Sequence, residues 1–406
     1  TRLTRCWAMS QATIEQLIAA HPTGYGLARD FYLNDDIYRR DIESIFLKTW
    51  ILVGHQSQVA EPGDFFITNV ANESVIIVRS DNGEINALLN VCRHRGSRVC
   101  LEAAGRKPRF VCPYHAWSYD LDGHLLAAPR AAEDFEKDQF SLKRVQLEEL
   151  HGMLFINFDD AADFAPARED LDAPFEPYEL ADAKIAHRQN YRIEANWKLA
   201  VENFCECYHC VPAHSEYSVA HSGAKPEKVD PEMLADVMSR VEACGLWPGR
   251  HDNSFITADP AEVDSYFIHF PLLKGHVTGS KDGQPVAPLL GSIKDFDGSA
   301  ADFQIGPVSY GLAYGDHVVL YRFIPVSRDV TDCEVIWLVR GDAEEGKDYD
   351  LDKLVWLWDV TTIADKKIIQ DNARGVESHF YTPGPFVPME RYAQQFTEWY
   401  LDVLKG

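Results

Sequence analysis

The chain is 406 residues long, is 46% hydrophobic and carries a formal net charge of −24, with 39 Lys and Arg against 63 Asp and Glu. This length exceeds one typical hydrophobic core, so we expect two domains. The acidic balance argues against a nucleic-acid surface or an anionic membrane as partner, and it is compatible with a cationic substrate. No segment approaches the roughly 20 consecutive apolar residues that span a bilayer.

The N-terminal region is predicted to be helical after a short leader. Residues 1–8 lack the apolar segment of a secretory signal peptide, and we expect them to be a non-native leader with Met9 as the natural start. Residues 12–21 and 36–48 follow the spacing of amphipathic helices. The apolar side of the second helix is formed by Tyr38, Ile42, Ile45 and Phe46.

Residues 51–158 change to short runs of β character, at 51–53, 65–68, 74–79, 85–91 and 153–158. Turn sequences such as Pro62-Gly63 and Asp122-Gly123 separate them, as is typical of antiparallel hairpins. This pattern predicts a small antiparallel β domain.

Two short motifs in this β region combine cysteine and histidine. Cys92-Arg-His94 is followed, after 17 residues, by Cys112-Pro-Tyr-His115. Two thiolates and two imidazoles suit either a structural zinc ion or a two-iron cluster in which two histidines replace two cysteines on one iron. Because each loop supplies one ligand of each kind, the cysteine pair can hold one iron and the histidine pair the other.

After a predicted linker at 159–172, which is acidic and rich in alanine, the sequence predicts a central helix that begins at Asn196, a plausible N-cap. Its apolar face is predicted to be formed by Trp197, Val201, Phe204 and Tyr208. Glu202, Glu206 and His209 share a second face of this helix. Burial of carboxylates and an imidazole is costly unless they are paired or bind a metal.

Pro212 should interrupt this helix, because proline lacks an N–H and disfavours helical geometry at the residue before it. A break there could bring His214 beside His209. The two histidines would then be ligands of one metal, with Glu206 as a supporting carboxylate. The alternative interpretation is a core helix with a solvated edge of Glu and His.

The C-terminal half is predicted to begin with an acidic, irregular stretch at 226–262 and to continue as a meander of strands at 309–314, 317–325 and 333–340. Helices are predicted at 351–374 and 389–404. A sheet with helices packed against it makes this second domain α+β.

Nine cysteines in a chain without a secretion signal favour metal ligation and reduced thiols over a disulfide framework, and they favour a cytoplasmic protein. Cys205, Cys207 and Cys210 would point in different directions on one helix. We therefore interpret them as small buried core residues and not as a separate zinc site.

Three motifs carry a family resemblance. Cys-Arg-His-Arg-Gly at 92–96 and Cys-Pro-Tyr-His-Ala-Trp-Ser-Tyr at 112–119 resemble the Rieske motif of the large (alpha) subunit of Rieske non-heme iron oxygenases. The resemblance extends to Asn-Trp-Lys-Leu-x-x-Glu-Asn-Phe at 196–204. It implies N-terminal helices at 1–48 that pack on the catalytic domain, a Rieske [2Fe-2S] domain at 49–160 and a catalytic mononuclear iron domain at 161–406.

The resemblance also assigns the metal ligands. Cys92, His94, Cys112 and His115 are expected to bind the [2Fe-2S] cluster. The ligands of a mononuclear Fe(II), two histidines and one carboxylate, are expected to be His209, His214 and Asp365. Such a triad leaves positions open for O2 and a neighbouring substrate. Asp371, six residues further on, is the other carboxylate candidate on the same predicted helix.

Glu206 matches a family position that usually holds Asp. In the family this carboxylate links an iron-ligand histidine to a cluster-ligand histidine of the neighbouring subunit, by resemblance His209 to His115 of the partner subunit. The resemblance thus implies a homotrimer in which Glu206 is the electron bridge between subunits. Glutamate here is similar to enzymes that act on quaternary ammonium compounds.

The branch of the family therefore suggests the substrate. Residues 375–384 and the Glu-Cys-Tyr-His-Cys core resemble the demethylases of betaines, with proline betaine (stachydrine) as the first expectation and glycine betaine as the next. Aromatic faces attract a quaternary ammonium group. The candidate cage residues are Trp247, Tyr266, Phe267, Phe270, Tyr310 and Tyr314. We also expect a basic residue that binds the betaine carboxylate, but the sequence does not indicate which one.

The resemblance implies a monooxygenase that uses O2 and removes an N-methyl group as formaldehyde. No glycine-rich dinucleotide motif follows a strand, so we expect no NAD or flavin bound in this chain and a separate NAD(P)H-dependent reductase. One alternative is a Rieske oxygenase that acts on an aromatic ring or an O-methyl group. Another is a non-enzymatic electron carrier or zinc-stabilised binding protein, against which the intact triad argues.

Overall fold

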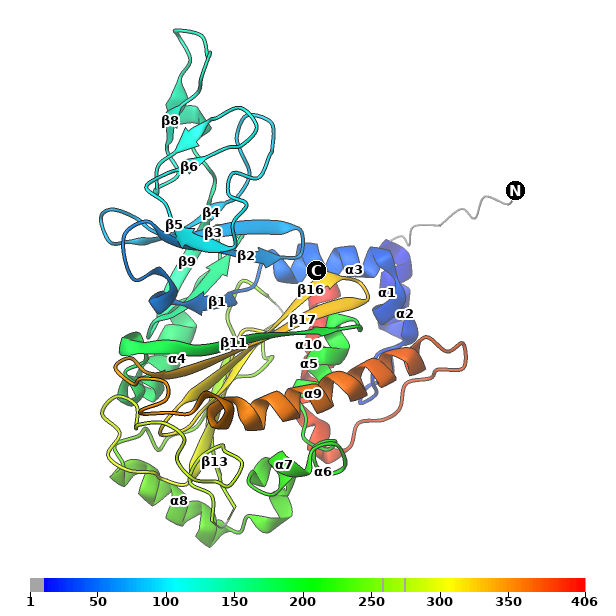
Figure 1. Ribbon diagram of the computed structural model, residues 1–406. Coiled ribbons are helices and arrows are strands. Elements are labelled where there is room, and N and C mark those ends of the chain that lie inside the picture. The colour runs from blue at the N-terminus through cyan, green and yellow to red at the C-terminus, as the bar shows by residue number, and fades with distance from the viewer. Residues whose placement is uncertain (1–10, 258, 274, 406) are drawn as a thin grey trace.

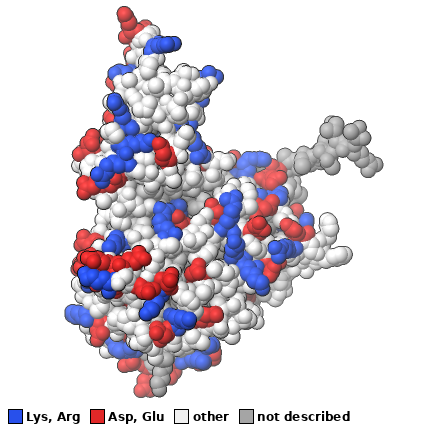
Figure 2. Space-filling model, viewed as in Figure 1, with Lys and Arg blue, Asp and Glu red and all other residues white. Residues whose placement is uncertain are grey.

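The computed structural model describes residues 11–257, 259–273 and 275–405, and the expected leader at 1–8 lies outside them. Figure 1 shows a β-rich upper part above a larger lower part in which helices cover a long sheet, and Figure 2 shows acidic and basic side chains over the same face of both parts. The prediction of an α+β fold, with a small antiparallel β domain and a larger domain with a helix-flanked antiparallel sheet, is confirmed. Within the described part of the chain, no helix combines the length and the apolar character that a membrane span requires.

The upper part contains two antiparallel sheets. The seven-stranded sheet has the order β1 (Ile51–His55), β10 (Met153–Asn157), β9 (Arg144–Leu150), β4 (Ile85–Leu89), β3 (Glu73–Arg79), β2 (Asp64–Val70) and β5 (Ala104–Arg106). The three-stranded sheet consists of β6 (Phe110–Val111), β7 (Ser118–Tyr119) and β8 (Leu125–Ala127). The five predicted runs coincide with β1, β2, β3, β4 and β10.

The lower part is organised by a second seven-stranded antiparallel sheet. Its order is β11 (Ala183–Ile193), β17 (Val330–Arg340), β16 (Val318–Ser327), β15 (Ser309–Ala313), β14 (Ser299–Ile305), β13 (Ser265–Pro271) and β12 (His251–Asp252). The predicted meander of three strands is therefore β15 to β17. Alternation along β16 explains why both faces are apolar: Val319 and Tyr321 pack in one core cluster, and Leu320 packs in the other.

Helices cover both faces of this sheet. The α-helices are α1 (Gln11–Ala20), α2 (Arg29–Leu33), α3 (Asp35–Asp41), α4 (Ala165–Phe175), α5 (Trp197–Phe204), α6 (Cys210–Ala213), α7 (Ser215–Ser218), α8 (Pro231–Ala243), α9 (Leu351–Val376) and α10 (Arg391–Lys405). Shorter turns of other helical types are η1 (Ile42–Phe46, a π-helix that extends α3), η2 (Gln56–Val59), η3 (Lys137–Phe140), η4 (Glu176–Tyr178), η5 (Leu180–Asp182), η6 (Ser222–Ala224), η7 (Pro226–Lys228) and η8 (Pro388–Glu390).

Two predictions of irregular structure are wrong. The expected linker at 159–172 contains most of α4, which buries Leu171 and Phe175 against the sheet. The expected irregular stretch at 226–262 contains α8. The Asp230 side chain accepts a hydrogen bond from the Met233 N–H at 2.8 Å and so caps α8, which buries Val237 and Val241 one turn apart. The exposed sides of α4 and α8 consist largely of acidic residues and alanine, so the sequences of these helices resemble those of loops.

A buried ion pair anchors α5, the helix that leads to the site described below. Lys198 and Asp41 are both fully buried and in contact. Asp41 also accepts hydrogen bonds from Trp197 Nε1 at 3.0 Å and from the Tyr400 hydroxyl at 2.8 Å. One carboxylate thus joins α3, α5 and α10, and it fixes the start of α5 against the N- and C-terminal helices.

Candidate active site

The two Cys–His loops of the upper part have the same backbone design. The Cys92 N–H donates to the Ser97 carbonyl at 2.8 Å, and the Cys112 N–H donates to the Trp117 carbonyl at 2.8 Å. At the equivalent position of each loop φ is positive, 77° at Gly96 and 60° at Ala116. Glycine adopts this conformation without strain, and Ala116 adopts it in the matching turn of the second loop.

The donor atoms of these loops fit a [2Fe-2S] cluster. Cys92 and Cys112 are buried, whereas His94 and His115 are exposed, and the two imidazole centroids lie 4.6 Å apart. The Tyr119 hydroxyl lies 3.3 Å from the Cys92 sulfur. Two thiolates on the inner side and two imidazoles on the outer side match a cluster with one cysteine-bound iron and one histidine-bound iron.

The second site begins where α5 ends. The helix stops at Phe204, so Tyr208 is exposed, and Glu206 and His209 are not on the helix that carries Glu202. The predicted continuous polar face is therefore wrong. Glu202 lies elsewhere, within hydrogen-bond distance of the Tyr32 hydroxyl at 2.9 Å. Pro212 does not end the helix either: it lies in the first turn of α6, where a missing N–H costs little.

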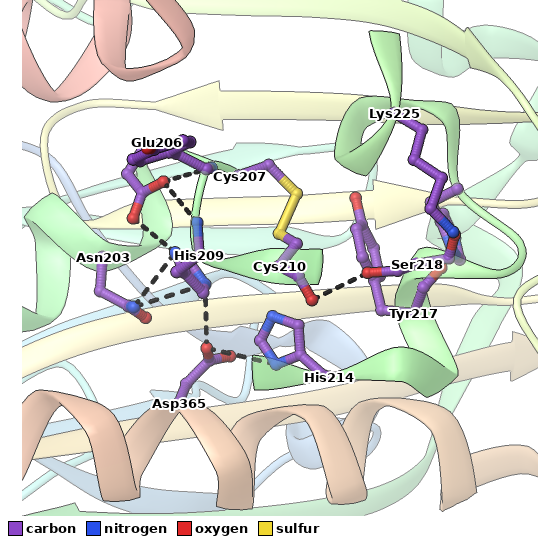
Figure 3. Close-up of a disulfide and its surroundings, with 12 residues drawn as sticks. Asn203, Glu206, Cys207, His209, Cys210, His214, Tyr217, Ser218, Lys225 and Asp365 are labelled. Atoms are coloured by element: carbon purple, nitrogen blue, oxygen red, sulfur yellow. Dashed lines mark hydrogen bonds and ion pairs between the residues drawn. A yellow bond between two sulfur atoms is a disulfide. The ribbon is translucent and has the colours of Figure 1, made fainter. Parts of the chain in front are cut away.

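The loop after α5 nevertheless brings His209 and His214 together, with ring centroids 5.1 Å apart. Asp365 of α9 completes the group. Its Oδ1 lies 3.2 Å from His209 Nε2 and 3.6 Å from His214 Nδ1 (Figure 3). Asp371, the other candidate, is exposed and pairs with Arg374 at 2.9 Å. The structure thus gathers the three side chains that the resemblance selects.

Two observations show that these three residues fit a metal ion. His214 Nδ1 is buried and has no hydrogen-bond partner among the described residues, and it lies 3.6 Å from Asp365 Oδ1, the atom that also faces His209. On its other side, His209 Nδ1 lies 2.5 Å from Glu206 Oε1. A carboxylate on the far ring nitrogen is the usual support of a metal-bound histidine, because it fixes the tautomer and the ring orientation.

The electrostatics of the group favour a cation. Burial alone would lower the pKa of His209, but hydrogen bonds with Asp365 and Glu206 outweigh it and raise this pKa to about 9. Burial lowers the pKa of His214, and Asp365 opposes this change. Two carboxylates on opposite sides of one imidazole create a negative field, which a divalent cation would balance.

A disulfide joins Cys207 and Cys210 beside this group, with the two Cα atoms 4.9 Å apart (Figure 3). The prediction of reduced thiols is wrong for this pair, and so is the interpretation of Cys207 and Cys210 as simple core residues, whereas Cys205 is a free thiol that packs against the core as predicted. The reason is local: the chain leaves the helix at Phe204, and the turn that follows brings the two cysteines close together. The cross-link encloses Tyr208 and His209 in a short loop.

A cavity of about 600 Å³ opens beside the triad. His209, His214 and Asp365 line one side of it, and β13, β14 and β15 form its floor. Three of the predicted cage residues, Tyr266, Phe270 and Tyr310, line this cavity.

The other three predicted cage residues lie elsewhere. Alternation along β13 turns Phe267 to the opposite face of the sheet, where Trp247 packs on it with centroids 6.0 Å apart. Tyr314 lies behind the cavity wall, with its hydroxyl 2.7 Å from His221 Nε2.

Sequence reasoning missed several residues that line the cavity. Trp358 and Thr361 share a face of α9 with Asp365, at the helical spacing of i, i+3 and i+7. That spacing was a usable signal once Asp365 was chosen. Tyr217 of α7 and Asp302 of β14 had no such signal, because their position depends on how the loop after α5 folds over the sheet.

The fold and the site together define a class: an oxygenase with a Rieske cluster domain and a two-histidine, one-carboxylate iron centre. Family models agree with this assignment. The Rieske [2Fe-2S] domain matches residues 49–146, and the catalytic domain of the ring hydroxylating alpha subunit matches residues 180–406. The chain therefore belongs to the alpha subunits of Rieske non-heme iron oxygenases, and the predicted family, enzyme class and iron cofactors are confirmed.

Curated relatives cover nearly the whole chain. It is 33% identical to the glycine betaine monooxygenase oxygenase subunit of Pseudomonas aeruginosa over 95% of this chain and 90% of the relative. It is also 33% identical to the protein of the same name from Chromohalobacter salexigens, over 94% of this chain and 86% of that relative. A crystal structure of the quaternary ammonium Rieske monooxygenase CntA superposes with a TM-score of 0.72 at 22% identity, over 96% of this chain and 98% of the CntA chain. The two proteins therefore share the same fold.

Proposed function

We propose that this chain is the oxygenase component of a monooxygenase that removes an N-methyl group from a betaine. The observation that carries the proposal is the cavity: aromatic side chains line it beside the triad, and a quaternary ammonium group is attracted to aromatic faces. The similarity to two glycine betaine monooxygenase subunits supports the same substrate class. Glycine betaine and proline betaine are the first substrates to test.

The residues of the chain have separate tasks in this reaction. His209, His214 and Asp365 would hold the mononuclear iron, which supplies oxidation by O2, and the Rieske cluster supplies electrons. Glu206 holds the His209 ring by its Nδ1 and accepts a hydrogen bond from the His209 N–H at 3.2 Å, so the ring cannot rotate freely. Tyr266, Phe270 and Tyr310 position the ammonium group so that a methyl group faces the triad. Hydroxylation of that methyl gives an N-hydroxymethyl ammonium ion, which releases formaldehyde and a proton and leaves the demethylated tertiary amine.

The arrangement of one chain supports an oligomeric enzyme. Figure 1 places the Cys–His loops near β6 at one end of the molecule, and α6 and α7, which flank His214, at the other. A route for electrons from the Cys–His loops to the triad within one chain is therefore long, and a shorter route must run between chains. We infer a homotrimer in which Glu206 links His209 to His115 of the partner subunit, with electrons supplied by a separate NAD(P)H-dependent reductase.

Formaldehyde release tests the substrate. The purified chain, loaded with both iron centres and supplied with a compatible reductase, should release formaldehyde from glycine betaine or proline betaine in proportion to O2 consumed. About three irons and two labile sulfides per chain should be present. Hydroxylation of an aromatic ring or loss of an O-methyl group, without formaldehyde from any betaine, would overturn the proposal.

Glu206→Gln tests the link between subunits. We expect the variant to keep both iron centres and the trimer, because Glu206 is not an iron ligand, and to lose most of its turnover. Rapid-mixing measurements should show the cluster reduced but slow to reoxidise in the presence of O2 and substrate. Reoxidation at the wild-type rate would contradict the role of Glu206.

A further inference from the structure

The cavity contains a carboxylate that the proposed reaction has not yet used. Asp302 lies in β14, where alternation turns Ala300, Asp302 and Gln304 toward the cavity and turns Ala301 and Phe303 toward the core. The Tyr266 hydroxyl donates a hydrogen bond to Asp302 Oδ1 at 2.8 Å. The half-buried side chain thus lines the cavity floor.

Among the residues that the structure describes, no basic side chain neutralises Asp302. Across residues 11–257, 259–273 and 275–405, no Lys, Arg or His side chain forms an ion pair with it, and its stabilising contacts are the Tyr266 hydroxyl and the Phe303 N–H. Burial consequently raises the pKa of Asp302 to about 7. A carboxylate in this position is costly unless a cation meets it. The other carboxylates on the cavity wall, Glu206 and Asp365, already face His209.

Asp302 shares its cavity with the triad and with the aromatic wall. Its carboxylate contacts the Tyr266 hydroxyl, and Tyr310 lines the same cavity from the neighbouring strand. The carboxylates of Asp302 and Asp365 both raise the pKa of Tyr217. A cation held at Asp302 would therefore lie next to the aromatic wall, in the cavity that the triad also lines.

The opposite charge is found at another part of the cavity wall. Arg250 and Arg391 both line the cavity, and each has a guanidinium nitrogen 3.0 Å from the same oxygen of Asp252. Two cations that share one carboxylate leave a net positive charge. Both side chains are more than half exposed, at 57% and 58%, which places them at the mouth. Asp252 and Asp302 lie two strands apart in the sheet and are offset by two residues in register, a separation of roughly 12 Å.

We propose that Asp302 is the counter-charge of the substrate's ammonium group and that Arg250 and Arg391 receive its carboxylate. A zwitterion would then enter with its ammonium group first and present an N-methyl group to the triad. An uncharged aromatic substrate would leave Asp302 without a counter-charge, so this residue selects cations. The inference rests on the proposed function for the identity of the ligand class, but it concerns binding and not turnover.

Binding measurements test Asp302 directly. The ligands are glycine betaine and 3,3-dimethylbutanoate, its isostere with an uncharged tert-butyl head, titrated by calorimetry without O2 into the protein with both iron centres loaded. The wild type should bind the betaine on the order of 10- to 100-fold more tightly than the isostere, as expected for a desolvated charge pair. Equal affinities in the wild type would overturn the proposal without any variant.

Asp302→Asn should reduce this ratio several-fold, mainly by weaker binding of the betaine, and the preference that remains is that of the aromatic faces. Asp264→Asn is the matched control: Asp264 is a carboxylate next to β13 with a pKa that burial raises to about 7, and it is not among the described residues that line the cavity. It should retain the wild-type ratio. Melting temperature and the visible spectrum of the cluster verify the fold of both variants, and an unchanged ratio in a folded Asp302→Asn overturns the role of Asp302.

A third ligand separates the two ends of the site. Tetramethylammonium has no carboxylate, so the double variant Arg250→Met, Arg391→Met should bind it as the wild type does and should bind glycine betaine several-fold more weakly. Unchanged betaine binding would overturn the arginine half of the proposal. Cation selectivity that depends on Asp302, without formaldehyde from any betaine, would leave the site assignment intact and reject the proposed function. Formaldehyde release from a betaine, with a binding ratio that Asp302→Asn leaves unchanged, would support the proposed function and reject the role of Asp302.

Discussion

The buried pair of Lys198 and Asp41 offers a sharp test of how α5 is anchored. Both side chains are fully buried, and Asp41 accepts three hydrogen bonds, from Lys198, Trp197 and Tyr400. Asp41→Ala would leave an ammonium group buried without a counter-charge and would remove the acceptor of two neutral donors. Loss of one partner of a buried ion pair costs about 3–5 kcal/mol.

This cost translates into a measurable change in melting temperature. With about 2.1 cal/mol/K of unfolding entropy per residue, a chain of 406 residues gains about 0.85 kcal/mol/K on unfolding as one unit. A loss of about 3–5 kcal/mol therefore lowers Tm by about 4–6 °C. Calorimetry at fixed iron loading measures this shift. The iron content should also fall, because α5 leads directly into the loop that carries His209.

Two further variants test whether the loss of stability comes from the unpaired buried charge of Lys198. Asp41→Leu combined with Lys198→Met removes both charges together, so its Tm should lie closer to the wild type than that of Asp41→Ala. Glu344→Ala breaks an exposed pair with Lys347 and should shift Tm by less than about 1 °C. The reasoning is refuted if Asp41→Ala melts within 1 °C of the wild type, or if the double variant is the less stable of the two.

Three more predictions concern the iron site and pH. Asp365→Ala should reduce iron from about three to about two atoms per chain and keep the visible spectrum of the cluster, whereas Asp371→Ala should keep all three; retained iron in Asp365→Ala would contradict the ligand assignment. Cys207→Ser should release the loop around His209 and lower the melting temperature modestly, because a cross-link over four residues contributes at most about 2 kcal/mol. A parallel loss of iron affinity, measured by chelator competition, would show that the disulfide supports His209 as a ligand. An unchanged Tm would show that the disulfide does not stabilise the fold. Burial raises the pKa of Glu202 to about 8, so the folded state favours its protonated form. The stability from this group is complete below its ordinary pKa of 4.5 and is lost as pH rises toward 8. Glu202→Gln should therefore flatten the decline of Tm across that interval, and a parallel decline in both proteins would refute this.

The sequence predicted the elements whose patterns are strictly local. Strands such as β3 and β16 follow from runs of β-branched and aromatic residues, and α9 follows from a long amphipathic repeat with Asp350 as its N-cap. The Cys–His loops were identified because both ligands of each loop lie within four residues of one another. In contrast, α4 and α8 were missed, because their acidic and alanine-rich exposed sides hide short buried faces.

The sequence by itself determined which chemical groups this chain offers: the two Cys–His motifs and the pair of His209 and His214 are encoded in short local segments. Tertiary structure alone decided where α5 ends and that Asp302 faces the cavity while Phe267 does not. These features depend on contacts between residues far apart in the chain, such as Asp41 with Lys198 and Tyr266 with Asp302, and on a strand alternation in which a shift of one residue reverses the face. Local patterns carry no information about such contacts.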